Sequence, residues 1–176
     1  MASGASKSAA FMLLILNMGL YFLMIVIGSW AINHGIERSR ETAATGINIC
    51  RLNFPCMKIY IYFPMGNLAT RFFIILSLLA GVVGFTCSIT GLNNVFLWNA
   101  PNLHAAYASA LASLSLTLLA LGFACKEINI GWTDSALRTL EVVTIIVSGT
   151  QLLCTVAIHV GVEDAVARQK NLGGRY

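Results

Sequence analysis

Charge is scarce in this chain, and its distribution is more informative than its amount. Only 10% of the 176 residues are Asp, Glu, Lys or Arg, whereas about a quarter are charged in an ordinary soluble domain. No charged residue occurs in residues 8–36, 72–125 or 142–162. Because a bilayer-spanning helix needs about 20 mostly apolar residues, these windows hold one, two and one spans. The scarcity of charge excludes a soluble domain and predicts a multi-pass membrane protein, with the lipid bilayer as its first partner.

Other absences narrow the function. The sequence contains no Walker loop, dinucleotide-binding glycine motif, H-E-x-x-H or nucleophile elbow, so catalysis is not expected. No carboxylate is predicted near the middle of a span, so a carboxylate proton relay in the membrane core is not expected. Cys50 and Cys56 have only His34 as a nearby third ligand, so neither a metal site nor a cofactor is expected. The net charge of +4 is too small and scattered to favour nucleic acid.

The apolar windows predict four helices. The run from Ser8 to Asn33 exceeds the about 7 to 15 residues of a signal-peptide core and lacks an A-x-A-like cleavage site, so it is retained. Residues 72–125 would make one helix of about 80 Å, but Gly, Asn and Pro between residues 91 and 102 interrupt it. We predict an all-α integral membrane protein, an antiparallel four-helix transmembrane bundle forming a single membrane domain over residues 1–176. Its helices are expected at about 9–33, 70–92, 102–125 and 139–162, with a long, partly irregular first loop, 34–69, that holds a short strand or interfacial segment at 58–63.

Two predicted helices carry small residues at four-residue steps, the pattern that lets membrane helices approach closely. We interpret both sets as packing seams. A flexible gate at Gly81 and Gly84 is the alternative for the first set. The sets are Ser77, Gly81, Gly84 and Ser88 in the second helix, and Ala105, Ser109 and Ser113, with Ala108 and Ala112 alongside, in the third.

The fourth helix carries a polar stripe, whose members are spaced three and four residues apart and so lie within an arc of about 80°. A polar stripe is costly against lipid, so it is expected to face the bundle interior or a water-filled path. One interpretation is hydrogen bonding between helices; the other is a ligand site or pathway, favoured by the titratable His159 within the span. The polar stripe consists of Glu141, Thr144, Ser148, Gln151, Thr155 and His159.

Depth along the helices predicts one specific contact. Asn17 and Thr155 lie at similar distances from the terminal ends of the first and fourth helices, at about 1.5 Å per residue. An asparagine within a span needs a hydrogen-bond partner, so we expect Asn17 to face the polar stripe near Gln151 or Thr155. At the opposite end of the bundle, Arg71 could attract an anion or act as an interfacial anchor.

Several strings resemble the AWPM-like family of plant plasma-membrane proteins induced by abscisic acid. They are residues 11–21, Gly28–Asn33, Ala124–Gly131 and Gln151–His159, and together they span all four predicted helices. The resemblance implies a stress- and seed-associated plasma-membrane protein connected with tolerance of drying and freezing. For some members it also implies cellular uptake of abscisic acid.

Two functions therefore stay open. One is a carrier for a small weak acid such as abscisic acid; the other is a non-transporting structural or membrane-stabilising protein that acts through packing, lipids or partners. A homo-oligomer is compatible with either.

Orientation rests on conflicting signals. With the termini and the second loop on one side, that side holds four of the eleven basic residues, and the positive-inside rule then favours cytoplasmic first and third loops. A disulfide between Cys50 and Cys56 would instead place the first loop in an oxidising compartment. The resemblance and these cysteines together lead us to predict cytoplasmic termini.

Overall fold

The computed structural model describes residues 2–50, 68–130 and 135–173. Within them the chain forms four helices: α1 (Ala2–Cys50), α2 (Leu68–Leu97), α3 (Ala100–Ile130) and α4 (Ser135–Gly173). Each helix contains a segment long and apolar enough to cross a membrane. The predicted all-α four-helix membrane fold is therefore confirmed.

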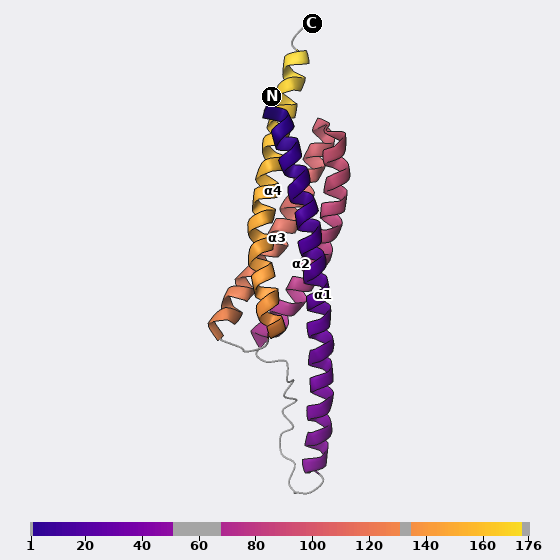
Figure 1. Cartoon of the computed structure of the whole chain (residues 1–176), viewed down its shortest axis with the longest axis vertical. Coiled ribbons are helices and arrows are strands. Elements are labelled where there is room, and N and C mark those ends of the chain that lie inside the picture. The colour runs from indigo at the N-terminus through magenta and orange to yellow at the C-terminus, as the bar shows by residue number, and fades with distance from the viewer. Residues whose placement is uncertain (1, 51–67, 131–134, 174–176) are drawn as a thin grey trace.

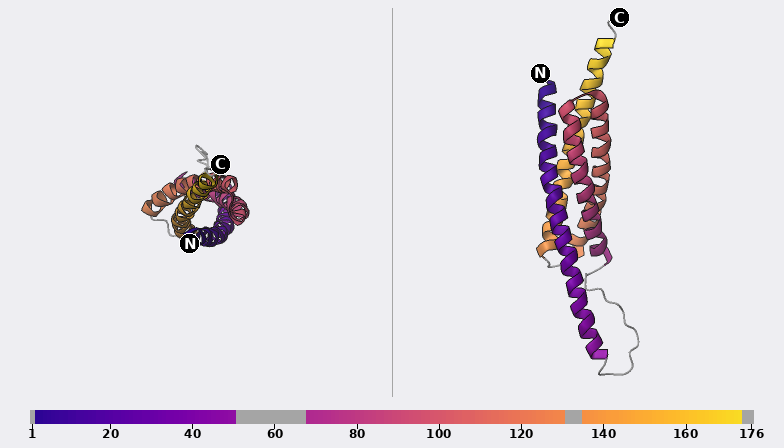
Figure 2. Two further views of the ribbon diagram at one scale, coloured as in Figure 1. Left: turned by 90° about the horizontal axis from the view of Figure 1, so that it is seen from above. Right: turned by 90° about the vertical axis from the view of Figure 1, so that its right-hand side faces the viewer.

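The helices form a closed ring. α1 packs against α2 and α4, and α3 packs against the same two helices, so α1 stands opposite α3 and α2 opposite α4 (Figure 2). Both chain termini lie at the same end as the α2–α3 connection (Figure 1). We call this the terminal end, and we call the opposite end, where α2 begins and α3 finishes, the loop end.

The first helix is much longer than predicted. α1 continues past residue 33 to Cys50, so the first part of the predicted loop is helical and projects beyond the bundle at the loop end (Figure 1). Residues 34–50 contain charged residues, alanine and threonine but no proline. Such residues end an apolar span without ending a helix. The strand or interfacial segment predicted at 58–63 lies outside the described residues.

The connection between α2 and α3 is a two-residue turn rather than a loop of about ten residues. Trp98 has a φ of 46°, and its N–H donates to Asn94 O at 3.3 Å, which is the pattern of a left-handed residue ending a helix. The Leu103 N–H donates to Asn99 O at 2.9 Å. Pro101 lies in the first turn of α3, where its missing N–H removes no hydrogen bond. The predicted break is in the right place, but Asn, Gly and Pro shorten these helices very little.

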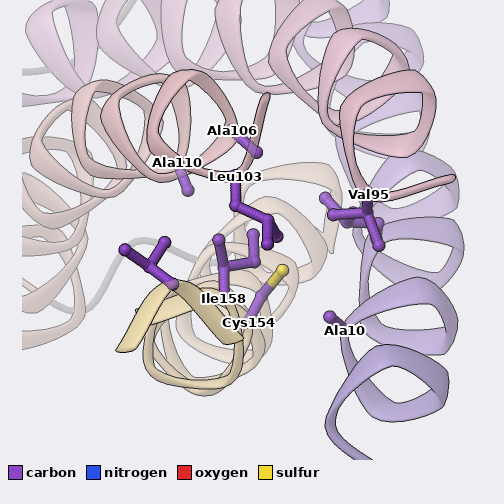
Figure 3. Packing of buried hydrophobic residues seen from close by; sticks show 9 residues of the cluster. Ala10, Val95, Leu103, Ala106, Ala110, Cys154 and Ile158 are labelled. Atoms are coloured by element: carbon purple, nitrogen blue, oxygen red, sulfur yellow. The ribbon is translucent and has the colours of Figure 1, made fainter. Parts of the chain in front are cut away.

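Apolar side chains fill the ring in two separate clusters of buried residues. The terminal cluster, shown in Figure 3, contains Ala10, Leu14, Val95, Leu103, Ala106, Ala110, Cys154, Ile158 and Val162. The loop cluster contains Tyr21, Met24, Phe73, Ala80, Ala120, Ala124, Leu140 and Val147.

The small residues of α2 form a packing seam against α1, as predicted. A Cβ atom added at Gly81 would lie 3.0 Å from a side-chain carbon of Ile25, and one added at Gly84 would overlap the ring of Tyr21. The absence of a side chain at these two positions therefore lets α1 and α2 approach closely.

The seam predicted on α3 is wrong for its alanines. Ala105, Ala108 and Ala112 are exposed, whereas Ala106 and Ala110 are buried. α3 carries alanine on adjacent faces, so residue size alone did not fix its rotation within the bundle.

Candidate functional site

The predicted contact of Asn17 is confirmed. Asn17 Nδ2 on α1 donates to Gln151 Oε1 on α4 at 2.9 Å, and Gln151 Nε2 donates to Ala110 O on α3 at 3.1 Å. Asn17 is fully buried and Gln151 is 2% exposed. Two side-chain amides thus join three helices inside the membrane domain.

The backbone carbonyl of Ala110 fixes the orientation of both amides. A carbonyl only accepts, so the atom of Gln151 that faces Ala110 must be its nitrogen, and Gln151 Oε1 then faces Asn17. Asn17 must meet that oxygen with its own nitrogen. Asn17 Oδ1 is left buried without a hydrogen-bond partner among the described residues.

Tyr21 crosses the ring from α1 to α3. Its hydroxyl lies 2.9 Å from both Ser113 Oγ and Thr117 Oγ1. Thr117 gives its single hydroxyl hydrogen to Ser113 O at 2.7 Å, so Tyr21 donates to Thr117 and Ser113 donates to Tyr21. Tyr21 was not predicted from the sequence, although its position four residues after Asn17 places both on one face of α1.

Together these groups form a layer that separates the two apolar clusters. We call it the polar belt, and every helix contributes to it. On α1 it follows Leu14 of the terminal cluster, and on α4 it lies between Val147 of the loop cluster and Cys154 of the terminal cluster. The polar belt consists of Asn17, the Tyr21 hydroxyl, Ser88, Ser113, Thr117 and Gln151, all from residues that are no more than 3% exposed.

Most of the polar stripe faces inward, as predicted. Glu141, Thr144, Ser148, Gln151 and Thr155 are at most 9% exposed. Their hydroxyls bond within α4: Thr144 donates to Leu140 O at 2.7 Å, Ser148 to Ile145 O at 2.8 Å and Thr155 to Gln151 O at 2.9 Å. Of the polar stripe, Gln151 is therefore the member that hydrogen-bonds to other helices in the described structure.

The inward-facing prediction is wrong for His159. Its side chain is 51% exposed and lies 3.4 Å from the Glu163 carboxylate, and its ring centroid is 5.1 Å from that of Tyr107. Two four-residue steps from Gln151 rotate the direction by about 80°. This rotation carries His159 off the buried face, which continues through Ile158 and Val162.

The loop end contains a buried carboxylate that the sequence analysis also missed. Glu127 is 1% exposed. Its Oε1 accepts a hydrogen bond from Thr70 Oγ1 at 2.7 Å, whereas its buried Oε2 has no partner in the part of the chain described here. Glu127 and Arg138 both act electrostatically on Glu141. Arg71 directly follows Thr70, is half-buried and makes an interaction of its own.

At the terminal end, aromatic side chains and Lys7 join the start of α1, the α2–α3 turn and α4. Lys7 Nζ donates to Phe96 O at 3.2 Å and lies 5.6 Å from the Trp98 ring centroid. On its other side, the Trp98 ring packs against α4, where a Cβ added at Gly161 would lie 3.0 Å from it. The Trp98 ring thus covers the terminal cluster.

The structure describes the side chains of three of the five cysteines. Cys56 lies outside the described residues, and only the backbone of Cys50, the last residue of α1, is described. The disulfide between them therefore stays a prediction. Cys87, Cys125 and Cys154 are free. Within the described ranges, no three His, Cys, Asp or Glu residues gather as metal ligands.

Comparison with known proteins agrees with the resemblance drawn from the sequence. The pattern of the AWPM-19-like family matches residues 15–161. The chain is 37% identical over 160 residues to Membrane protein PM19L of Oryza sativa subsp. japonica, covering 90% of this chain and 82% of that protein. No solved structure matches.

Proposed function

The chain belongs to the AWPM-19-like family, and we propose that it mediates uptake of abscisic acid, or a similar small weak acid, across the plasma membrane. On this proposal it acts in the response to abscisic acid, drying and freezing. The proposal combines the resemblance described above with the chemistry of the polar belt.

The observation that carries the proposal is the unpartnered Asn17 Oδ1. Leaving a buried amide oxygen without a hydrogen bond costs about 1 to 3 kcal/mol of free energy. Binding of a solute that donates a hydrogen bond to this oxygen is therefore favoured. The O–H of a neutral carboxylic acid is such a donor. Ser77 Oγ, which is also buried without a partner among the described residues, can donate to another oxygen of the same solute as it passes α2.

The surroundings suit an amphipathic solute. The terminal and loop clusters flank the polar belt with apolar side chains, which is the usual composition of a small-molecule site. The anion of a weak acid is expensive to desolvate, so we place the neutral acid at the polar belt. We assign Arg71 the role of attracting the anion to the loop end before that step.

The role first considered for His159 has to change. The titratable His159 favoured a ligand site on the polar stripe, but its exposure places it outside the polar belt. Gln151 remains in the proposed site, where it orients Asn17. Glu141, Thr144, Ser148 and Thr155 line the same helix face, and we assign them packing and spacing rather than direct contact with the solute.

Uptake by purified protein in liposomes tests the proposal. Radiolabelled abscisic acid should enter faster than into protein-free liposomes. The paired variant Asn17→Leu with Gln151→Leu removes both amides at similar volume, and it should bring uptake down to the protein-free rate. Thr150→Val is the matched control, since the Thr150 hydroxyl bonds to its own helix at Ile146 O. Uptake by the paired variant at the parent rate would refute the transport proposal.

The competing proposal is a structural, membrane-stabilising role. The observation that favours it is that all three polar-stripe hydroxyls already bond to backbone carbonyls of α4, as hydroxyls in packed membrane helices often do. On that view the polar belt only fixes helix registration, with about 0.6 kcal/mol per contact. The liposome experiment separates the two, because a structural protein adds nothing to the protein-free rate.

We keep the proposal that both termini are cytoplasmic, which places the loop end outside. Cys50 ends α1 beyond the bundle (Figure 1), so it should react with a membrane-impermeant thiol reagent added to intact cells after external reduction. Cys154, which is fully buried, is the internal control and should not react. Labelling of Cys50 only after cells are opened would reverse the orientation.

A further inference from the structure

Glu127 is the buried titratable group that the polar belt does not use. It lies within the candidate span of α3, Ala100–Asn129, and is 1% exposed. An ionisable side chain inside a membrane span is expensive and is usually retained for function. One of its oxygens accepts from Thr70, and the other meets no donor among the described residues.

We propose that Glu127 is a proton-binding site, and that its proton accompanies the weak acid during uptake. The proton-binding part stands on the geometry of Glu127 alone. The second part rests on the proposed function. This second part places a proton transfer from Glu127 to the solute at the loop end, where the solute would enter.

The available partners fit a proton better than a metal ion. Glu127 acts electrostatically on Glu141 of α4, and no group of three metal-ligating residues exists among the described residues. Two positive charges belong to the same end of the bundle: Arg138 on α4 acts on Glu141, and Arg71 follows Thr70 on α2. Protonation of Glu127 removes its repulsion of Glu141.

The unpartnered oxygen is the atom at which the proton is expected to bind. Thr70 already donates to Oε1, so a second donor there would compete with it. A proton on Oε2 leaves the Thr70 hydrogen bond in place and cancels a charge that the interior solvates poorly.

The uptake step is a balanced proton transfer. The acid arrives at the loop end as a carboxylate anion, drawn by Arg71. The Oε2–H bond of protonated Glu127 breaks, and the proton forms an O–H bond on the solute carboxylate. Glu127 is left as a carboxylate and the solute becomes the neutral acid, whose O–H then donates to Asn17 Oδ1. Glu127 regains a proton from water at the loop end, so one anion and one proton enter together.

Infrared spectroscopy tests the proton site without any solute. The full chain in lipid is stepped between acidic and alkaline pH, and the carbonyl stretch of protonated carboxylic acids is recorded. One component should disappear in Glu127→Gln and persist in Glu163→Gln, which removes an exposed carboxylate. Thr70→Val should shift the frequency of that component, whereas Thr70→Ser should restore it. A complete set of pH-dependent bands in Glu127→Gln would overturn the proposal.

Transport measurements then test the coupling. Glu127→Gln keeps an oxygen for Thr70 but cannot release a proton. Because the solute anion can then no longer be neutralised at the loop end, both net uptake and exchange of internal unlabelled for external labelled acid, measured above the protein-free rate at neutral pH, should fall by about a hundredfold. Exchange should recover at an acidic pH that protonates the solute in water. Net uptake at the parent rate at neutral pH, or no recovery of exchange at acidic pH, would overturn the coupling. If the parent protein neither exchanges nor accumulates acid, the proposed function fails, whatever the infrared result.

Discussion

The two halves of the bundle are closed by different physical means. At the terminal end, a two-residue turn, the Trp98 ring and the terminal cluster fill the ring with apolar contacts. At the loop end, the apolar loop cluster is followed by Glu127, which is buried with one oxygen unpaired in the described chain. Dry packing holds the terminal end closed in this structure, whereas a buried carboxylate is expensive unless its protonation is used. On the proposed function, proton transfer therefore takes place at the loop end, and the terminal half is a seal that must open to release the solute.

The largest expected effect comes from the packing seam between α1 and α2. Gly84→Leu should lower the free energy of unfolding by about 3 kcal/mol, because its side chain would overlap the Tyr21 ring. Titration with sodium dodecyl sulfate in mixed micelles measures this. Gly122→Leu is the control, since the space at that position is open. Equal losses in the two variants would show that the Tyr21 ring does not require Gly84.

The terminal seal should depend on Trp98. Trp98→Ala is expected to lower the free energy of unfolding by about 2 kcal/mol, because the ring packs against Gly161 and the terminal cluster. Trp98→Gly loses the same contacts but relieves the positive φ, so it should be more stable than the alanine variant by about 0.5 to 1 kcal/mol. The same unfolding titration compares them. A glycine variant less stable than the alanine variant would contradict the strain argument.

A smaller effect is expected where Tyr21 joins the polar belt. Tyr21→Phe removes one hydroxyl that bridges Ser113 and Thr117, and should lower the free energy of unfolding by about 1 kcal/mol. Tyr107→Phe serves as the control, because Tyr107 is half-buried and stands outside the polar belt. If both variants unfold at the parent midpoint, the cross-ring hydrogen bonds contribute no stability.

The smallest effect is expected at the rim of the terminal end. Lys7→Met removes the charge over the Trp98 ring and the hydrogen bond to Phe96 O. It should lower the free energy of unfolding by about 0.5 kcal/mol. Lys126→Met, which removes an exposed lysine at the loop end, should leave the midpoint unchanged. A larger effect of Lys126→Met would reverse the proposed contrast between the two ends.

The sequence predicted those features that depend on hydropathy and depth. Uncharged windows located the four spans, and counting residues from the terminal ends was enough to pair Asn17 with Gln151. It did not locate helix ends, because residues 34–50 and 93–94 favour water or turns yet remain helical here. Aqueous solubility and helical conformation are separate properties of a segment.

The remaining errors concern helix rotation. His159 lies about 80° around α4 from Gln151, which is enough to carry a side chain off the buried face. Glu127 lies two residues beyond the predicted end of the third helix at 125, so it was assigned to a loop, and its burial beside Thr70 depends on the arrival of another helix. Tyr21 shares the face of Asn17, so its place in the polar belt was accessible from spacing.

The hydrogen bond between Asn17 and Gln151 has a consequence for biogenesis. It joins residues 134 positions apart, so α1 enters the bilayer while its asparagine has no partner and keeps this unpaired amide until α4 has been synthesised. A chain truncated before α4 therefore lacks the partner of Asn17 and leaves a polar group inside the membrane, which is energetically costly. The first helix is therefore fully hydrogen-bonded only once the last helix is in place.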